Sequence, residues 1–272
     1  GLSFHVQAQE EGVFILWRND SMCLQALENT LSEQRALRLS LDPYLLYISK
    51  NKVKHALRTR YYVTTTGSST ALVDASLGQM YYADYQASKK LKHLDLSFGA
   101  TLFYNRLNDA IANITIGTNL RQRGNVDAIV AKGIELSGEA IFGEVAISGS
   151  YAFSDSKVRA SGSAIALNGL SPAQSPRHAA NATVRWSPST GAVFSATARY
   201  VGAQFEDDLE SNILPSALTL DSFAQIPLTR QIALTGRVEN IFNKAVVTRK
   251  VDTSIDLGTP RILWIGLTFT TR

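Results

Sequence analysis

The chain has 272 residues, of which 45% are hydrophobic and 18% are charged, with a net charge of +4 and a single cysteine. This composition excludes collagen-like, disulfide-stapled and disordered proteins. The longest apolar runs, Val13 to Trp17 and Tyr44 to Ile48, are far shorter than the roughly 20 residues of a membrane-spanning helix. A soluble β domain and a transmembrane β-barrel both fit the mean hydropathy of -0.03, because barrel strands alternate lipid-facing and lumen-facing residues.

Alternation of apolar and polar residues is the dominant pattern along the chain. It is clearest from Leu94 to Tyr104 and from Val145 to Phe153, where every second residue is apolar or glycine. A period of two places apolar side chains on one face of a strand and polar ones on the other. The pattern predicts strands, in chain order, at 2–18, 35–48, 54–66, 79–88, 94–116, 125–142, 145–155, 178–186, 191–202, 217–227, 231–246 and 260–271.

The connections between these predicted strands alternate between short turns and long loops. Only Ser21 to Glu33 shows some helical periodicity, inside the first long loop. Short turns at one end and long loops at the other are typical of outer-membrane barrels. We therefore predict an all-β fold in which 1–272 forms one antiparallel transmembrane β-barrel of about 12 strands, with short periplasmic turns and longer extracellular loops. The long loops are expected at 19–34, 67–78, 117–124, 156–177, 203–216 and 247–259.

Charge and aromatic placement favour the same fold. A Lys or Arg on the lipid face costs about 2 to 4 kcal/mol at the bilayer midplane, and one face of nearly every predicted strand is free of charge. Tyr and Trp lie near predicted strand ends, where interfacial girdles would form. Taken singly, each of them is better explained as an ordinary packed aromatic, so only the pattern favours a girdle. Examples are Trp17, Tyr47, Tyr61, Tyr81, Trp186 and Tyr200.

Patterns for catalysis, metal binding or nucleic-acid binding are weak. Asp207 and Asp208 lack an EF-hand spacing and are expected in a solvated loop, and 161–163 is expected to be a flexible connector. Cys23 has no partner for a disulfide, and basic residues are scattered among acidic ones rather than forming a stripe. We predict no enzyme activity, no metal site, no cofactor and no nucleic-acid partner. The histidines, which no nucleophile-elbow pattern accompanies, are His5, His55, His93 and His178.

Several segments of the chain resemble TonB-dependent outer-membrane receptors. The segment 237–244 reads RVENIFNK and 257–261 reads LGTPR, and both resemble the last two strands of that family. Segments at 102–111, 125–127, 133–136, 175–178 and 200–202 match it in the same order, so 94–272 resembles the final eight strands. The residues of the C-terminal motif are Glu239, Asn240, Phe242, Gly258, Pro260 and Arg261.

Residues 1–88 resemble a more central part of the family's barrel, through 40–44, 55–62 and 81–86. The resemblance implies a further stretch of barrel between the two blocks, so we hypothesise a shortened barrel that arose by deletion or fusion, with the join at 89–93. The resemblance includes neither the family's plug domain nor the segment that contacts TonB, so contact with TonB is not expected. Thr271 stands where the family has an outward aromatic, which implies less efficient insertion by the barrel assembly machinery.

The resemblance implies a receptor or transport module in a Gram-negative outer membrane, in contact with lipid, for a siderophore, a vitamin-like cofactor or an oligosaccharide. Lumenal guanidinium groups would favour anionic ligands. The same charges would also suit ion-pair ladders that brace a polar lumen. For the chain as a whole, a structural barrel fragment, a simple pore and a soluble β-sandwich binding protein are the alternatives. The candidate lumenal residues are Arg38, Arg58, Arg60, Asp84, Arg185, Arg199, Asp221, Arg237 and Glu239.

Overall fold

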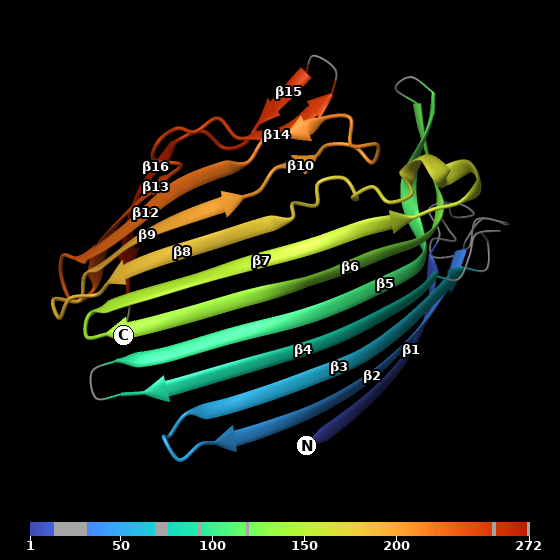
Figure 1. Ribbon diagram of the computed structural model, residues 1–272. Helices are drawn as coiled ribbons and strands as arrows, with labels where there is room; N and C mark the ends of the chain where they lie inside the picture. The colour runs from blue at the N-terminus through green and yellow to red at the C-terminus, as the bar shows by residue number, and fades with distance from the viewer. Residues whose placement is uncertain (14–31, 69–75, 92–93, 118–119, 252–253, 271–272) are drawn as a thin grey trace, which may run out of the picture.

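A computed structural model describes residues 1–13, 32–68, 76–91, 94–117, 120–251 and 254–270. A single 12-stranded antiparallel sheet dominates it and curves into a wall (Figure 1). Each strand of this sheet pairs with the next strand of the same sheet along the chain, which confirms the predicted all-β, up-and-down arrangement. The strands form one continuous sheet, not the two packed layers of a sandwich.

The strands of this main sheet agree in order with the predicted ranges. The sheet runs from β1 to β16, and no ladder joins these two outer strands within the described residues. Its strands are β1 (Leu2–Val13), β2 (Ser32–Ile48), β3 (Lys54–Ser68), β4 (Ser76–Lys90), β5 (Asp95–Gly117), β6 (Leu120–Phe142), β7 (Val145–Arg159), β8 (His178–Trp186), β9 (Val193–Val201), β12 (Ala217–Pro227), β13 (Ile232–Glu239) and β16 (Ile262–Phe269).

Short turns lie at one end of the sheet and the longer connections at the other (Figure 1). The longer connections contain regular structure that alternation did not predict: the 3₁₀ helix η2 (Gly162–Leu167) and the hairpins β10 (Gln204–Phe205) with β11 (Ile213–Leu214) and β14 (Val247–Val251) with β15 (Ser254–Leu257). Among the described residues, no helix is long and apolar enough to cross a bilayer. Most of the helical segment suggested at Ser21 to Glu33, and residues 14–18 of the first predicted strand, lie outside the described residues.

Two predicted boundaries were wrong. The loop expected at 117–124 is mostly strand, because the ladder of β5 with β6 continues through Ile114 opposite Gln122 to Gly117 opposite Leu120. The strand expected at 231–246 ends at Glu239 instead, because Asn240 has a positive φ of 48°. That left-handed backbone conformation ends extended structure, and Asn tolerates it better than most residues.

The register divides the sheet into two chemically different faces, because directly paired residues point to the same side. The outer face carries large apolar side chains that are left exposed, such as Leu102 at 59% and Leu263 at 64% exposure. The inner face carries charged residues in the middle of the strands, such as Asp84 and Asp221. Other exposed apolar residues of the outer face are Phe4, Leu41, Leu45, Phe98, Ile147, Val184, Leu218 and Ile265.

Aromatic side chains border the apolar band of the outer face at both ends, as predicted. Toward the loops, the ring centroids of Tyr61 and Tyr81 are 4.9 Å apart and those of Tyr81 and Tyr104 are 6.2 Å apart. Toward the turns, Tyr47 stacks on His55. On β5 the band extends from the row of Tyr47 to Tyr104, about 20 Å along the strand, on the order of the ~25 Å apolar band of a barrel.

A small apolar core lies at the loop end, between η2 and the strands β5, β6 and β7. Its largest members are Leu167 and Val158, each 1% exposed. Ile114 packs against this cluster, which explains why the β5–β6 hairpin continues beyond its predicted end. The remaining buried members are Ala110, Val126, Ala160 and Ala164.

Gly133 on β6 provides a test of the observed register. A Cβ atom there would lie 2.1 Å from the Phe153 carbonyl oxygen of β7 and 2.5 Å from the Phe103 ring. We expect Gly133→Ala to destabilise the sheet by about 3 kcal/mol, because backbone cannot yield as a flexible side chain can. Urea unfolding followed by heat-modifiable electrophoretic mobility measures the change.

Gly138→Ala, on the same strand, is the matched control, since the nearest atom to its added Cβ is 3.7 Å away. Equal unfolding midpoints for the two variants would contradict the close approach of β6 and β7 at Gly133.

Candidate functional site

The register places every predicted lumenal charge on the inner face of the sheet. These residues occupy strands from β2 to β13, so the structure divides them into separate groups. Arg58, Arg60 and Asp84 come together on β3 and β4, Arg199 and Asp221 on β9 and β12, and Arg237 and Glu239 on β13. Arg38 and Arg185 lie apart from these groups, on β2 and β8.

The charges on β2, β3 and β4 form one inner-face group. The Arg60 Nε lies 2.5 Å from the Asp42 Oδ1, in an ion pair between β2 and β3. Asp84 is only 4% exposed and accepts a hydrogen bond of 3.2 Å from the Thr101 hydroxyl. Asp42 was not among the predicted residues, although it continues the alternation of Arg38 and Ser40.

This group borders a hollow of about 560 Å³. Arg58 is exposed and pairs in register with Asp84, but it makes no ion pair among the described residues. Two tyrosines, Tyr44 and Tyr82, bring aromatic surface to the same hollow. The hollow therefore combines one guanidinium without a carboxylate partner, a second guanidinium in an ion pair, and phenol rings. Its lining consists of Ser3, Asp42, Pro43, Tyr44, Arg58, Thr59, Arg60, Met80 and Tyr82.

Most other predicted charges have partners within the wall. Arg199 pairs with Asp221, and the Arg237 Nη2 lies 2.8 Å from the Glu239 Oε1. The Arg38 Nη1 donates to the Gln9 side-chain oxygen at 3.0 Å. Arg185 is exposed and has no ion pair within the described residues. The paired residues match the alternative prediction of bracing ion pairs.

Asn240 of the C-terminal motif is buried and organises the turn after β13. Its Nδ2 donates to the carbonyl oxygens of Lys244 at 2.9 Å and Thr259 at 3.1 Å, and its Oδ1 accepts from the Lys244 amide at 2.8 Å. Its own amide donates to the Asp221 carboxylate at 2.8 Å. Because Asp221 also pairs with Arg199, this network joins β9, β12 and β13 to the segment that leads into β16.

The other motif residues support the same turn. The Arg261 amide donates to the Asn243 side chain at 2.9 Å, and the Gly258 amide donates to the Val246 carbonyl at 2.8 Å. Pro260 is exposed just before β16, and Phe242 is 76% exposed. In this arrangement the motif connects strands and does not line the hollow beside Arg58.

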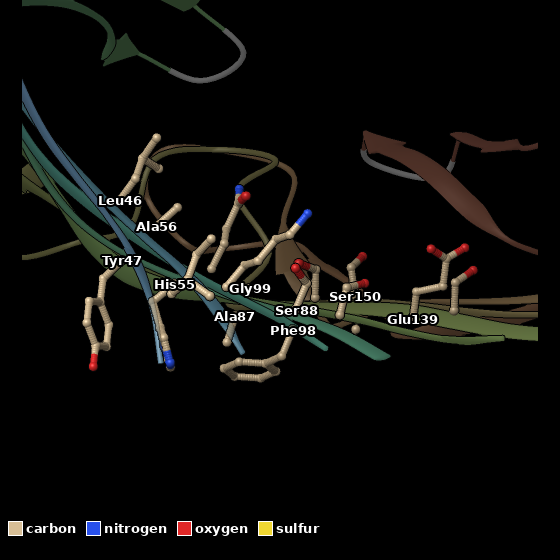
Figure 2. Close-up of a pocket in the computed structure, with 18 of the residues that line it drawn as sticks. Leu46, Tyr47, His55, Ala56, Ala87, Ser88, Phe98, Gly99, Glu139 and Ser150 are labelled. Carbon is tan, nitrogen blue, oxygen red and sulfur yellow. The ribbon is translucent and has the colours of Figure 1, made fainter. Parts of the chain in front are cut away.

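A second inner-face hollow, of about 690 Å³, lies nearer the turns. Figure 2 shows Leu46, Ala56 and Glu139 on the side of the sheet that faces the rest of the chain, with the rings of Tyr47 and Phe98 on the opposite side. Small residues make most of its floor, and the sequence signal that would have found it is their recurrence on the polar face. They include Ser88, Ser97, Gly99, Ser137, Ser148 and Ser150.

The acidic loop between β10 and β11 is docked, which corrects the expectation of a solvated loop. Asp207 is 3% exposed and accepts three backbone amides. The carboxylates of Asp208 and Glu210 accept the amides of Ala173 and Ser171, at 3.0 and 2.7 Å. Among the described residues, no group of three or more His, Cys, Asp or Glu side chains is placed to hold a metal ion.

A family profile described as TonB dependent receptor-like, beta-barrel matches residues 47–241. No curated protein matches the chain in sequence. Solved structures with the same fold include the FrpB iron transporter from Neisseria meningitidis, at 12% identity and a TM-score of 0.62, with 98% of this chain and 52% of that one covered.

Two further structures share the fold. The siderophore receptor PiuA from Acinetobacter baumannii is 15% identical with a TM-score of 0.57, over 88% of this chain and 43% of that one. The unliganded ferric citrate transporter FecA is 14% identical with a TM-score of 0.56, over 98% and 50%. The chain thus spans about half the length of the structures it matches. At these identities the likeness establishes the fold.

We expect Asn240→Ala to destabilise the fold by about 3 kcal/mol, because it leaves buried backbone groups without partners. Urea unfolding gives the change in free energy, and the exposed Asn113→Ala on β5 is the control. A loss below about 0.5 kcal/mol, the size of an ordinary surface substitution, would show that the Asn240 hydrogen bonds do not hold the turn.

Asp207 makes the acidic loop sensitive to pH. Burial by itself raises the pKa of Asp207, but the hydrogen bonds from Ser211, Asn212 and Leu209 outweigh it and hold the pKa below its ordinary value of 3.8. A depressed pKa stabilises the folded loop above the ordinary value, and this stabilisation is lost as the pH falls through the lower folded value.

We therefore expect the amides of Leu209, Ser211 and Asn212 to lose hydrogen-exchange protection below about pH 4. Asp207→Asn is expected to weaken protection at neutral pH and to remove the acid transition. Protection that is unchanged from pH 7 to pH 2 would contradict the role of the carboxylate.

Proposed function

The chain belongs to the TonB-dependent receptor-like β-barrel family. From that premise we propose that it forms part of the wall of an outer-membrane uptake barrel for a small anionic ligand such as a ferric siderophore. The observation that carries the proposal is the division of the sheet into an exposed apolar outer face and a charged inner face. Charges on the inner face meet water and ligand, while the outer face meets lipid.

The hollow between β2 and β4 is the proposed contact site for the ligand. The Arg58 guanidinium is exposed and has no ion pair among the described residues, so it has hydrogen-bond donors to offer an incoming carboxylate or catecholate. Asp84 opposite it is nearly inaccessible and engaged by Thr101. A ligand in the hollow would therefore meet the guanidinium rather than the carboxylate.

The tyrosines of the hollow narrow the ligand class further. Tyr44 and Tyr82 present rings beside Arg58 and Arg60, and aromatic surface next to guanidinium suits a ligand that is both flat and anionic. Catecholate or carboxylate chelates of iron have this character, whereas a neutral oligosaccharide lacks the charge. Two proteins of similar structure, a siderophore receptor and a ferric citrate transporter, support the same ligand class.

The proposal also covers location and partners. Under it, the outer face contacts the lipid of a Gram-negative outer membrane, and the barrel assembly machinery inserts the strands. The longer connections, including η2 and the β10–β11 hairpin, lie together at one end of the sheet (Figure 1). In this proposal that end is the extracellular one. In this proposal these residues make no contact with TonB and carry out no catalytic step.

We expect Arg58→Gln to weaken binding of a ferric catecholate or carboxylate chelate about tenfold, because it removes a charge-assisted hydrogen bond. Isothermal titration of the detergent-solubilised protein measures the affinity, and uptake of radioactive iron gives a second readout.

Arg185→Gln is the matched control. It removes an arginine from β8 of the same inner face that is also exposed and also has no ion pair within the described residues. Arg185 lies about five strand spacings, or roughly 24 Å, from Arg58 along the sheet. Unchanged affinity in both variants would reject the hollow as the contact site. Equal losses in both would indicate that the lumen attracts the ligand only through its overall charge.

A further inference from the structure

Basic side chains gather on the outer face near the loop ends of β5, β6 and β7. Arg106 and Lys157 both pair in register with Val130, so they flank the same position of β6 from either side. Lys132 lies two residues away on β6, on the same face. Neighbouring positions of this kind are about 5 to 10 Å apart, so the three cations, named here the basic patch, are close enough to contact one anion.

The basic patch lies at the depth of the loop-side aromatic girdle. Lys132 pairs in register with Tyr104, which pairs with Tyr81 on the next strand. The row that is aromatic on β3, β4 and β5 thus becomes cationic on β6. Aromatic girdles mark the level of the lipid headgroups, and the basic patch is therefore at headgroup depth.

The surroundings of the patch leave it with a positive excess. The nearest outer-face carboxylate, Asp155, lies in register beside Lys132 and forms an ion pair with Arg177 at 2.6 Å, so its one negative charge faces Arg177 as well as the patch. Arg106 donates to Asn108 at 2.7 Å and Lys157 to the Ser171 hydroxyl at 3.3 Å, both neutral partners. Lys132 is exposed and has no hydrogen bond or ion pair among the described residues.

Apolar side chains lie directly below the patch, toward the membrane centre. Leu102, Ile134 and Phe153 form one register row across β5, β6 and β7, two residues nearer the turns than Tyr104, Lys132 and Asp155. Cations at headgroup depth above an apolar row match the two ends of a lipid molecule, a charged headgroup and its acyl chains.

We propose that the basic patch of Arg106, Lys132 and Lys157 binds the phosphate of a lipid headgroup in the leaflet on the loop side. This inference rests on the membrane location of the proposed function, but not on its ligand, because the patch is on the opposite face of the sheet from the Arg58 hollow. The bound lipid would fix the β5–β7 part of the wall, and the β5–β6 hairpin beyond it, at a defined depth.

The test uses the protein extracted in mild detergent from membranes that contain it. The protein is titrated with phosphatidic acid or with phosphatidylcholine of the same acyl chains, and native mass spectrometry gives the dissociation constant of each bound lipid. We expect one phosphatidic acid to bind more tightly than phosphatidylcholine. Lys132→Gln should weaken the binding of phosphatidic acid about fivefold. The triple variant Arg106→Gln, Lys132→Gln, Lys157→Gln should weaken it roughly a hundredfold.

The control variant Lys50→Gln, Lys52→Asn, Lys89→Gln removes the same charge at the turn end and should retain the wild-type affinity for phosphatidic acid.

Heat-modifiable mobility identifies variants that fold, and if the triple variant does not fold, the affinity of Lys132→Gln alone decides. Equal phosphatidic acid affinity in wild type and Lys132→Gln, an equal loss in the control, or displacement of the lipid by millimolar inorganic phosphate would each overturn the proposal. Iron-chelate binding that persists in the triple variant would separate this site from the proposed ligand site.

Discussion

The constraint behind this structure is that lipid solvates neither charges nor unpaired backbone polar groups. A chain that crosses a bilayer as strands must pair its backbone within a sheet and keep one face of each strand apolar. The exposed Leu102 and Leu263 on the outer face, and the buried carboxylates Asp84 and Asp221 on the inner face, follow from this single requirement. The aromatic girdles follow from it too, because amphipathic rings are most stable where the apolar band ends.

Because the apolar residues face outward, polar networks supply much of the packing inside. The described residues have only a small apolar core, beneath η2, whereas the network of Arg199, Asp221 and Asn240 joins the strands near the C-terminus. The inner face thus serves two purposes with the same residue types. Charges that brace the wall have partners in it, whereas Arg58 and Arg185 have no ion pair among the described residues. In the function proposed above, Arg58 is the one of these two that meets the ligand.

Alternation was enough to predict the strands of the sheet and the shared face of the nine candidate lumenal residues, because both depend on a period of two along the chain. Alternation did not predict contacts between segments that are distant in the chain. The docking of Asp208 and Glu210 on the amides of Ala173 and Ser171, and the extension of β5 and β6 beside η2, depend on which loops meet in space. For the same reason, alternation alone did not separate Arg58 from Arg199, since only the folded wall shows that Arg199 has an ion pair and that Arg58 has none among the described residues.

Labelling along one strand tests the central claim, the division of each strand between lipid and lumen, most directly. Single cysteines at Ser97, Phe98, Ala100, Thr101, Leu102 and Phe103 of β5, in a background where Cys23 is replaced by Ser, would be labelled in bilayers. The register predicts that a lipid-soluble quencher reaches labels attached at positions 98, 100 and 102. Before labelling, only the cysteines at positions 97, 101 and 103 are expected to react with a water-soluble maleimide. Quenching without a period of two, or with the opposite phase, would contradict the assignment of the two faces.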